Sequence, residues 1–166
     1  MELFYKQTLH LLDTELDRIR KALERLPEEM IWRRGREGTN SVGNLCLHLA
    51  GNEYHNVVSA IGNKPFVRER SEEFLAERTH TGAELLEHLT YVRDESRKEI
   101  ERLTGEDLER VVTVVYPPGA EIASYQKTIL EILSHTTAHY SYHTGQIVYM
   151  TRLFQSGNER LLKWKH

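Results

Sequence analysis

Four long segments of this chain carry an apolar residue at nearly every third or fourth position. Such spacing places the apolar side chains on one face of an α-helix, where they can pack against other helices. The segments predict helices over Glu2–Leu26, Val42–Ile61, Thr81–Gly105 and Tyr125–Phe154. Typical stop signals follow two of them, Pro27 after the first helix and Gly62 after the second. Four long amphipathic helices predict an all-α fold, a four-helix bundle.

Two connections between these helices are distinctive. The stretch Asn63–His80 is long and polar, so we expect it to cross over along the bundle, with a short helical turn within Ser71–Glu77. The run Val111–Tyr116 is β-branched and is followed by prolines, which predicts a short extended segment before the last helix. We expect Glu121–Ser124 to pair with this segment in a small hairpin.

Length and composition are those of an ordinary globular protein. Of the 166 residues, 39% are hydrophobic and 28% are charged, so we expect residues 1–166 to form one domain. The formal net charge of -3 argues against a nucleic-acid partner, because proteins that bind nucleic acids draw much of their affinity from positive charge placed near phosphates.

Three further features predict the cellular compartment. The single cysteine, Cys46, excludes an internal disulfide bond and fits a reducing compartment. The first residues, MELFYKQTLHLLDTEL, lack the basic and apolar regions of a signal peptide. No stretch reaches the roughly 20 apolar residues of a membrane span. We therefore expect a cytoplasmic protein without a membrane partner.

Three of the nine histidines lie in His135–Gln146, the stretch HTTAHYSYHTGQ of the last predicted helix. His139 and His143 are four residues apart, so their imidazoles lie on one helix face and can share a metal ion. Each step of four residues drifts by roughly 40° around the helix, which splays His135 and His143 by about 80°. We therefore expect His135 to neighbour a metal site rather than to bind the metal.

The second predicted helix carries a polar stripe on an otherwise apolar element. His48, Asn52 and His55 follow one another at positions i, i+4 and i+7. Buried polar groups need partners, so this stripe faces either solvent or a site. If His48 faces His139 and His143, the three imidazoles form a metal site with an open fourth position, which is the ligand count of catalytic zinc. The alternative is that these histidines lie on the surface or make ordinary hydrogen bonds.

Several neighbours of these histidines are candidates for supporting roles. Asn52 and Gln146 share helix faces with the candidate ligands and could orient a water or an imidazole, or be surface amides. His55 could be a fourth ligand, a hydrogen-bonded neighbour or a solvent-facing residue. No glutamate forms an HExxH arrangement with the histidine pair, which argues against a zinc protease. We interpret Cys46 as a small core residue.

Two segments together resemble the DinB/YfiT-like superfamily of metal-binding four-helix bundles, and in particular an uncharacterised DinB-like branch. NSVGNLCLHLAGN, at Asn40–Asn52, is similar to the second-helix histidine segment of that superfamily, and HTTAHYSYHTGQI, at His135–Ile147, is similar to its HxxxHRGQ-type segment. The resemblance covers almost the whole chain. It implies that three histidines bind the metal, namely His48, His139 and His143. Thr144 stands where the superfamily usually has arginine.

The resemblance also implies what such a site does. Characterised members include bacillithiol S-transferases and mycothiol-dependent maleylpyruvate isomerases, and similar proteins are commonly homodimers that bind zinc or nickel. We therefore expect a divalent-metal-dependent enzyme. It would be S-transferase-like, with a low-molecular-weight thiol as cosubstrate and an electrophilic small molecule as substrate, or a related hydrolase. The alternative is a non-catalytic or stress-related bundle in which the metal is structural.

Overall fold

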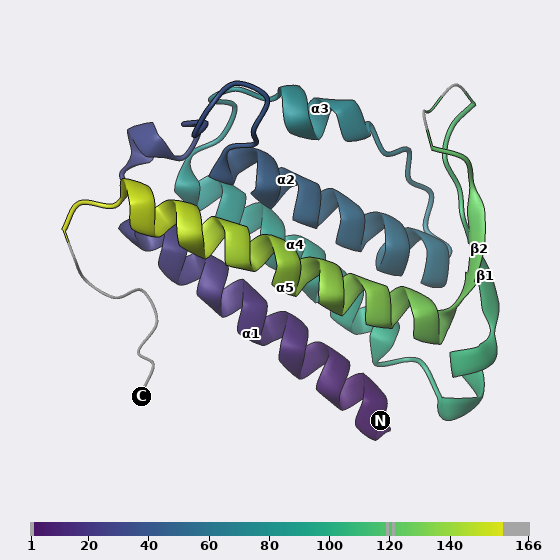
Figure 1. Ribbon diagram of the computed structural model, residues 1–166. Helices are drawn as coiled ribbons and strands as arrows, with labels where there is room; N and C mark the ends of the chain where they lie inside the picture. Colours follow the sequence, from purple (N-terminus) through teal and green to yellow (C-terminus); the bar gives the residue numbers. More distant parts are fainter. Residues whose placement is uncertain (1, 119, 121, 158–166) are drawn as a thin grey trace.

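The structure is a computed structural model and describes residues 2–118, 120 and 122–157. Its long helices are α1 (Leu3–Arg25), α2 (Val42–Glu53), α4 (Gly82–Ile100) and α5 (Ile129–Phe154). The connections contain the short helix α3 (Arg70–Leu75) and the strands β1 (Val111–Val114) and β2 (Tyr125–Thr128). As Figure 1 shows, the long helices lie side by side and the two strands stand at one end of them.

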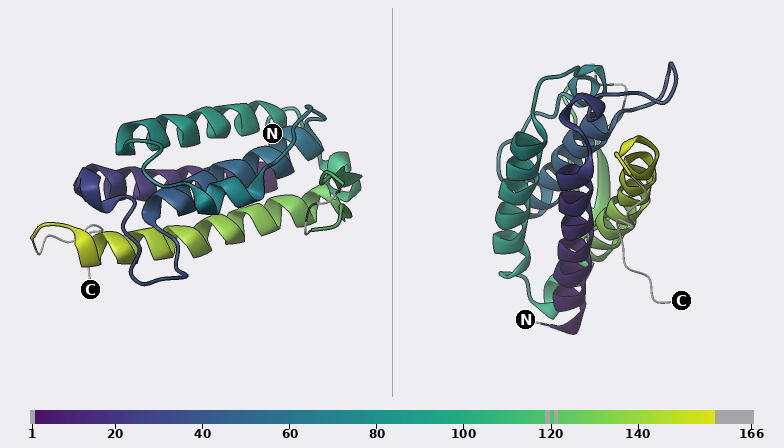
Figure 2. Two further views of the ribbon diagram at one scale, coloured as in Figure 1. Left: turned by 90° about the horizontal axis from the view of Figure 1, so that it is seen from above. Right: turned by 90° about the vertical axis from the view of Figure 1, so that its left-hand side faces the viewer.

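The long helices form a bundle in which each contacts two others. α1 packs against α4 and α5, and α2 packs against the same two helices. α2 and α4 run in the same direction, so the chain between them returns along the bundle and carries α3 with it (Figure 1 and Figure 2). The predicted all-α four-helix bundle and its crossover connection are therefore confirmed.

Three of these helices begin at a reciprocal cap. The capping pairs are Ser41 with Asn44 for α2, Thr81 with Glu84 for α4, and Thr128 with Glu131 for α5. In each pair the hydroxyl accepts a hydrogen bond from the backbone N–H three residues on, whose side chain accepts one from the backbone N–H of the capping residue. These polar pairs fix where α2 and α5 begin, and so at which level of the bundle their histidines lie.

The second predicted helix is continuous, but its last eight residues, Tyr54–Ile61, are π-helical. The backbone N–H of Gly62 bonds to the carbonyl of Val57, five residues back, at 3.0 Å. π-Helical turns are rare and often occur at functional sites.

Gly62 follows the helix as expected, but its φ is -80°, and the left-handed residue is Asn63 with φ 53°. Gly62 is needed for close packing and not for a left-handed conformation, because a Cβ at this position would lie 2.6 Å from the carbonyl oxygen of Val58.

The hairpin differs from the expected one. β1 pairs antiparallel with β2 in a register that places Val114 opposite Tyr125. The expected partner, Glu121–Ser124, is wrong, because residues 122–124 form no strand and residue 121 lies outside the described residues. Since β2 is extended, α5 begins after Thr128 and not at Tyr125. Tyr125 and Thr128 both favour strands, and the Thr128 hydroxyl also caps the helix.

The interior of the bundle is largely apolar but contains a buried ion pair. Large buried side chains of the core include Tyr5, Leu12, Ile19, Leu49, Leu89 and Ile132. Among them, Arg93 of α4 donates to both carboxylate oxygens of Glu53 on α2, at 2.7 and 2.9 Å. No helix in the described part of the chain is long and apolar enough to cross a lipid bilayer.

Candidate metal centre

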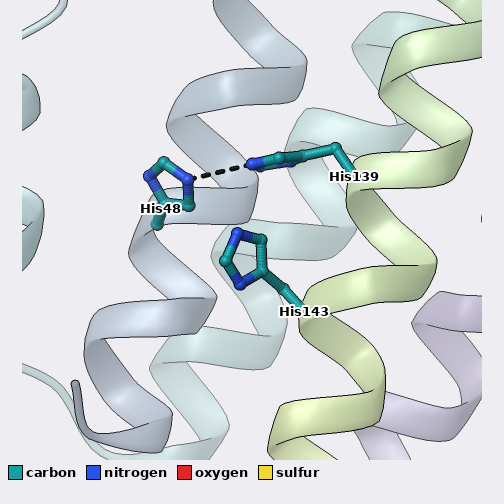
Figure 3. A group of neighbouring side chains, drawn as sticks. All are labelled: His48, His139 and His143. Carbon is teal, nitrogen blue, oxygen red and sulfur yellow. Dashed lines mark hydrogen bonds between the residues drawn. The ribbon is translucent and has the colours of Figure 1, made fainter. Parts of the chain in front are cut away.

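Three histidine rings meet between α2 and α5. His48 lies on α2, and His139 and His143 lie one turn apart on α5; Figure 3 shows the three rings gathered between the helices. The Nε2 atoms of His48 and His139 are 3.0 Å apart. One ring nitrogen from each histidine lies within 4.8 Å of the other two. The structure therefore brings together the three histidines that the sequence singled out, with His48 buried and the other two half-buried.

An ion pair from the crossover connection holds His48. Glu73 of α3 accepts a hydrogen bond from His48 Nδ1–H at 2.9 Å; we assign the proton to Nδ1 because a carboxylate can only accept. Arg68 donates to the same carboxylate from Nε at 2.7 Å and from Nη2 at 2.8 Å, and Nη2 also donates to the backbone carbonyl of His48 at 3.3 Å. Such a carboxylate fixes the tautomer and orientation of an imidazole, so the Nε2 lone pair of His48 faces the other two rings.

Gly51 lets this ion pair approach α2. A Cβ at Gly51 would lie 2.2 Å from Glu73 Oε1 and 3.2 Å from Arg68 Nε. Gly51 is three residues after His48, so it borders the same part of the helix surface. Arg68 is 4% exposed and Glu73 is 9% exposed. Loss of either residue would therefore leave the other as a buried charge without its partner, which is unfavourable.

Glu73 and Arg68 were not among the site residues predicted from the sequence. Both lie in a polar connection whose charges resemble those of any exposed loop, and only the tertiary fold brings them to His48. One chemical signal was available, because ligand histidines usually donate their second N–H to a carboxylate or carbonyl. That rule makes the acidic residues of the crossover candidates, but it does not choose among Glu69, Glu72, Glu73 and Glu77.

The two histidines of α5 are held differently from each other. Gln146 Oε1 accepts a hydrogen bond from His143 Nδ1–H at 2.7 Å, so the Gln146 amide orients the ring of His143. To orient an imidazole was one of the roles considered for Gln146 from the sequence. The Nδ1 atom of His139 is buried and makes no hydrogen bond among the described residues. Ring contacts complete the surroundings, with His135 stacked on His139 at 5.8 Å between ring centroids and Tyr142 edge-on to His143 at 4.9 Å.

Burial keeps the α5 pair neutral. Desolvation, together with the nearby His48 and His143, lowers the pKa of His139 to about 3. Desolvation also lowers the pKa of His143, while the hydrogen bond to Gln146 acts in the opposite direction. A neutral imidazole has the free lone pair that a metal ion requires. Both rings are therefore available as ligands at neutral pH without the loss of a proton.

The chain matches a known family over nearly its whole length. The family described as "Protein of unknown function (DUF1572)" matches residues 3–165. The chain belongs to the DUF1572 family.

Two crystal structures resemble the DUF1572 protein in fold. A DinB-like protein from Bacillus cereus is 15% identical with a TM-score of 0.68, and the match covers 89% of this chain and 91% of that one. The DinB-like protein YjoA from Bacillus subtilis is 14% identical with a TM-score of 0.65, over 93% of this chain and 99% of that one. No curated protein shows significant sequence similarity to the chain. The DUF1572 protein therefore has a DinB-like fold, as the resemblance implied.

The histidine cluster of the DUF1572 protein fits a divalent metal ion. The two Nε2 atoms at 3.0 Å place nitrogen lone pairs against each other unless a proton or a cation lies between them. Three imidazoles without an added thiolate or carboxylate suit zinc, copper, iron or nickel rather than magnesium or calcium. Within the part of the chain that the structure describes, this is the one group of histidine, cysteine or acidic side chains close enough together to hold an ion.

Two other histidines that the sequence placed near the site lie outside the cluster. His55 is buried, and its Nε2–H donates to the carbonyl of Val115 beside the hairpin at 2.8 Å, so the structure does not place it as a fourth ligand. The π-helical turns that begin at Tyr54 change its angular position relative to His48. His135 is exposed and contacts His139 only through the stacked rings, as expected of a neighbour.

The remaining candidates belong to the packing around the site. Asn52 is buried, but its Oδ1 makes no hydrogen bond among the described residues, so its predicted orienting role stays a prediction. Cys46 is a core residue as expected, and burial raises the pKa of its thiol to about 12. Thr144, where the resembled superfamily usually has arginine, is buried in the bundle.

Proposed function

We propose that this DUF1572 protein is a divalent-metal-dependent enzyme whose ion is held by His48, His139 and His143. The observation that carries the proposal is an oriented cluster of three imidazoles, two of them half-buried, with no fourth ligand among the described residues. Three protein ligands and a free position are typical of catalytic zinc, whereas structural zinc usually has four protein ligands. The ion is Zn²⁺ in this proposal, and Ni²⁺ is the second candidate.

The proposed reaction is transfer of a low-molecular-weight thiol to an electrophilic small molecule. When bound, the ion would supply Lewis acidity, which lowers the pKa of a thiol or of water. Hydrolysis of a small molecule is the nearest variant, because it needs the same site and no thiol. Support for the thiol reaction comes from the resemblance to thiol-dependent members of the superfamily, and from the likeness in fold to DinB-like proteins.

The chain's own residues prepare this site in two ways. Glu73 and Gln146 hold the Nδ1–H protons of His48 and His143, so the Nε2 lone pairs stay directed inward. The rings of Phe74 and Tyr142 pack against the imidazoles of His48 and His143, at 4.8 and 4.9 Å between ring centroids, and limit their movement. A substrate would reach the site past the half-buried histidines of α5.

A conjugation assay tests this proposal. Protein loaded with Zn²⁺ or Ni²⁺ is incubated with N-acetylcysteine and 1-chloro-2,4-dinitrobenzene, and the thioether product is measured against metal-free protein. We expect product formation that needs the metal, is lost in His48→Ala and is kept in His10→Ala, which removes an exposed histidine outside the cluster.

Other outcomes of the assay assign the site differently. Equal consumption of the electrophile with and without thiol would contradict the transferase and favour the hydrolase. A protein that binds the metal, unfolds when the metal is removed and turns over neither substrate would favour the structural role. The cytoplasmic location, which the sequence predicts, and the homodimer, which the resemblance implies, both stay predictions. Light scattering of the purified protein tests the homodimer.

A further inference from the structure

The outward face of α5 carries no formal charge along most of its length. No Asp, Glu, Lys or Arg occurs between Glu131 and Arg152, although 28% of the residues in the whole chain are charged. Tyr142 and Tyr149 lie on this face and are each 65% exposed. The solvent-facing side of a surface helix usually carries charged and polar residues. Exposed tyrosine without charge beside it is instead typical of protein–protein interfaces, so this face is a candidate interaction surface.

The exposed residues of this face form one continuous stripe, which we call the α5 stripe. It begins at Glu131, ends at Arg152 and contains between them the exposed residues Ser134, Ala138, Ser141, Tyr142, Gly145 and Tyr149. Successive turns of the stripe are three or four residues apart, which keeps all of these positions on one side of the helix. With a rise of about 1.5 Å per residue, the stripe is about 30 Å long. A Cβ at Gly145 would meet no atom within 4 Å among the described residues, so there is open space above this part of the stripe.

Opposite charges stand at the two ends of the α5 stripe. Among the described residues Glu131 forms no ion pair; its Oε2 accepts hydrogen bonds from the backbone N–H and the hydroxyl of Thr128. Arg152 makes no hydrogen bond and no ion pair in the part of the chain that the structure describes. Two stripes packed antiparallel would place each Glu131 against the partner's Arg152, whereas parallel packing would bring like charges together.

The residues between these ends are complementary in size under the same antiparallel packing. A two-fold axis that passes between Ser141 and Tyr142 brings together positions that lie equally far from this point on the two helices. The facing pairs are then Ser141 with Tyr142, Ser134 with Tyr149, and Ala138 with Gly145. Each tyrosine therefore meets a serine, and two small residues face each other between these pairs. Large residues opposite small ones let helix surfaces interlock, and a two-fold interface needs one surface that is complementary to itself.

We propose that the α5 stripe binds the α5 stripe of a second copy of this chain, antiparallel and about a two-fold axis at the level between Ser141 and Tyr142. The observation that carries the proposal is the self-complementary order of charges and sizes along one exposed helix face. The resemblance to the DinB/YfiT-like superfamily implies a homodimer without naming a surface, and the proposal adds the surface, the direction and the register. It does not rest on the proposed function, because no residue of the stripe belongs to the histidine cluster.

This interface would border the candidate metal centre. Tyr142 of the stripe lies edge-on to His143, and the exposed His135, next to the stripe, stacks on His139. In the proposed register Tyr149 of the partner subunit lies at the level of His135, since the two positions are almost equally far from the axis. The second copy would therefore flank the rings that pack against the two clustered histidines of α5.

Sedimentation analysis of the full-length protein, metal-free and loaded with Zn²⁺, tests the interface. We expect a dimer in both states at micromolar concentrations. Ala138→Glu should weaken the dimer by about tenfold or more, because its carboxylate would lose water at the interface without gaining a partner. Ala83→Glu, at an exposed position of α4, is the matched control and should dimerise as the wild type does. Circular dichroism establishes that both variants are folded.

A cross-linking experiment tests the direction and the register. The Ala138→Cys and Gly145→Cys proteins are mixed under reducing conditions, allowed to exchange subunits and then oxidised; the native Cys46 is buried. We expect a covalent dimer in the mixture, because the proposed register places the two new thiols opposite each other. Neither variant alone should cross-link efficiently, since equal positions lie about 10 Å apart along antiparallel helices and a disulfide needs Cα atoms within about 7 Å.

Three results would overturn the proposed interface. A wild type that is monomeric at these concentrations would show that the stripe binds no second copy. An Ala138→Glu protein that dimerises as tightly as the wild type would assign the dimer to another surface. Efficient cross-linking of Ala138→Cys alone would show parallel packing. None of these measurements depends on a bound ion, so a failure of the metal centre and a failure of the interface are distinguishable.

Discussion

At the scale of single residues, the three clustered histidines differ in what contacts their Nδ1 atoms. His48 donates to a carboxylate, His143 donates to a neutral amide, and His139 has no hydrogen-bond partner there among the described residues. A carboxylate partner makes an imidazole a better ligand and fixes its orientation more firmly than an amide does. The metal affinity of the site should therefore depend most on the pair of His48 and Glu73.

Replacing Glu73 by Gln keeps the size of the side chain and removes its charge. We expect the Zn²⁺ affinity to fall by about 10–100-fold, because His48 loses the partner that fixes its tautomer. The free energy of unfolding should fall as well, since Arg68 loses its counter-charge. Competition with a chromogenic chelator measures the affinity. Glu72→Gln, at the exposed neighbouring position, is the control, and equal affinities of the two variants would contradict the role given to Glu73.

At the scale of elements, the crossover connection serves as part of the site as well as a link. Asn44 of α2 donates to the backbone carbonyls of Glu73 and Ala76, at 3.0 and 2.9 Å, and Arg34 donates to that of Phe74 at 2.9 Å. These bonds fix the backbone of α3 against the start of α2. These bonds thereby hold the Glu73 carboxylate within hydrogen-bond distance of His48.

Gly51→Ala tests whether Glu73 must approach α2 closely to hold His48. The added methyl group would overlap Glu73 Oε1 and push the ion pair away from α2, so we expect weaker Zn²⁺ binding by a protein that still folds. Gly145→Ala is the matched control beside His143, where a Cβ meets no atom within 4 Å. Gly145→Ala should keep the affinity and stabilise the protein by about 0.5–1 kcal/mol, because alanine favours a helix. An unchanged Zn²⁺ affinity in Gly51→Ala would contradict the claim that the close approach of Glu73 to α2 supports metal binding.

Periodicity was sufficient to predict the helices and the shared helix face of His139 and His143, because side-chain direction follows from helical spacing. It left open whether His48 faces this pair, and only the resemblance to the DinB/YfiT-like superfamily implied that it does. It was insufficient where pairing depends on the whole fold. Tyr125–Thr128 and the residues before it both allow strands, and only the tertiary structure selects the partner of β1. The π-helical segment was likewise hidden, since its residues fit an α-helix equally well, and its consequence is that His55 turns toward the hairpin.

At the scale of the whole molecule, a buried ion pair links α2 and α4, and its arginine also lies 3.6 Å from Asp13 of α1. Arg93 of α4 and Glu53 of α2 have side-chain exposures of 2% and 0%, and the Tyr140 ring of α5 lies 4.8 Å from the guanidinium carbon. Breaking such a pair leaves a buried charge without its partner, which is strongly unfavourable. The pair should therefore matter more to stability than the surface ion pairs of the protein.

Glu53→Gln tests the contribution of this pair to stability. We expect the free energy of unfolding of the metal-free protein to fall by about 3–5 kcal/mol, because the buried Arg93 charge would keep only Asp13, which is 3.6 Å away and 42% exposed, as a counter-charge. Urea denaturation in the presence of a chelator measures the change. Glu24→Gln, which breaks an exposed pair with Arg20, should cost about 1 kcal/mol or less. Similar losses in the two variants would show that burial does not set the importance of the pair.

The central claim is that His48, His139 and His143 together bind one divalent ion, and metal content tests it most directly. The wild type and single alanine variants are expressed with added Zn²⁺ or Ni²⁺, and elemental analysis is combined with native mass spectrometry. We predict about one ion per chain in the wild type, a loss of that ion in each of the three variants, and its retention in His135→Ala and His55→Ala. A wild type without a bound ion, or full occupancy in any of the three cluster variants, would contradict the claim.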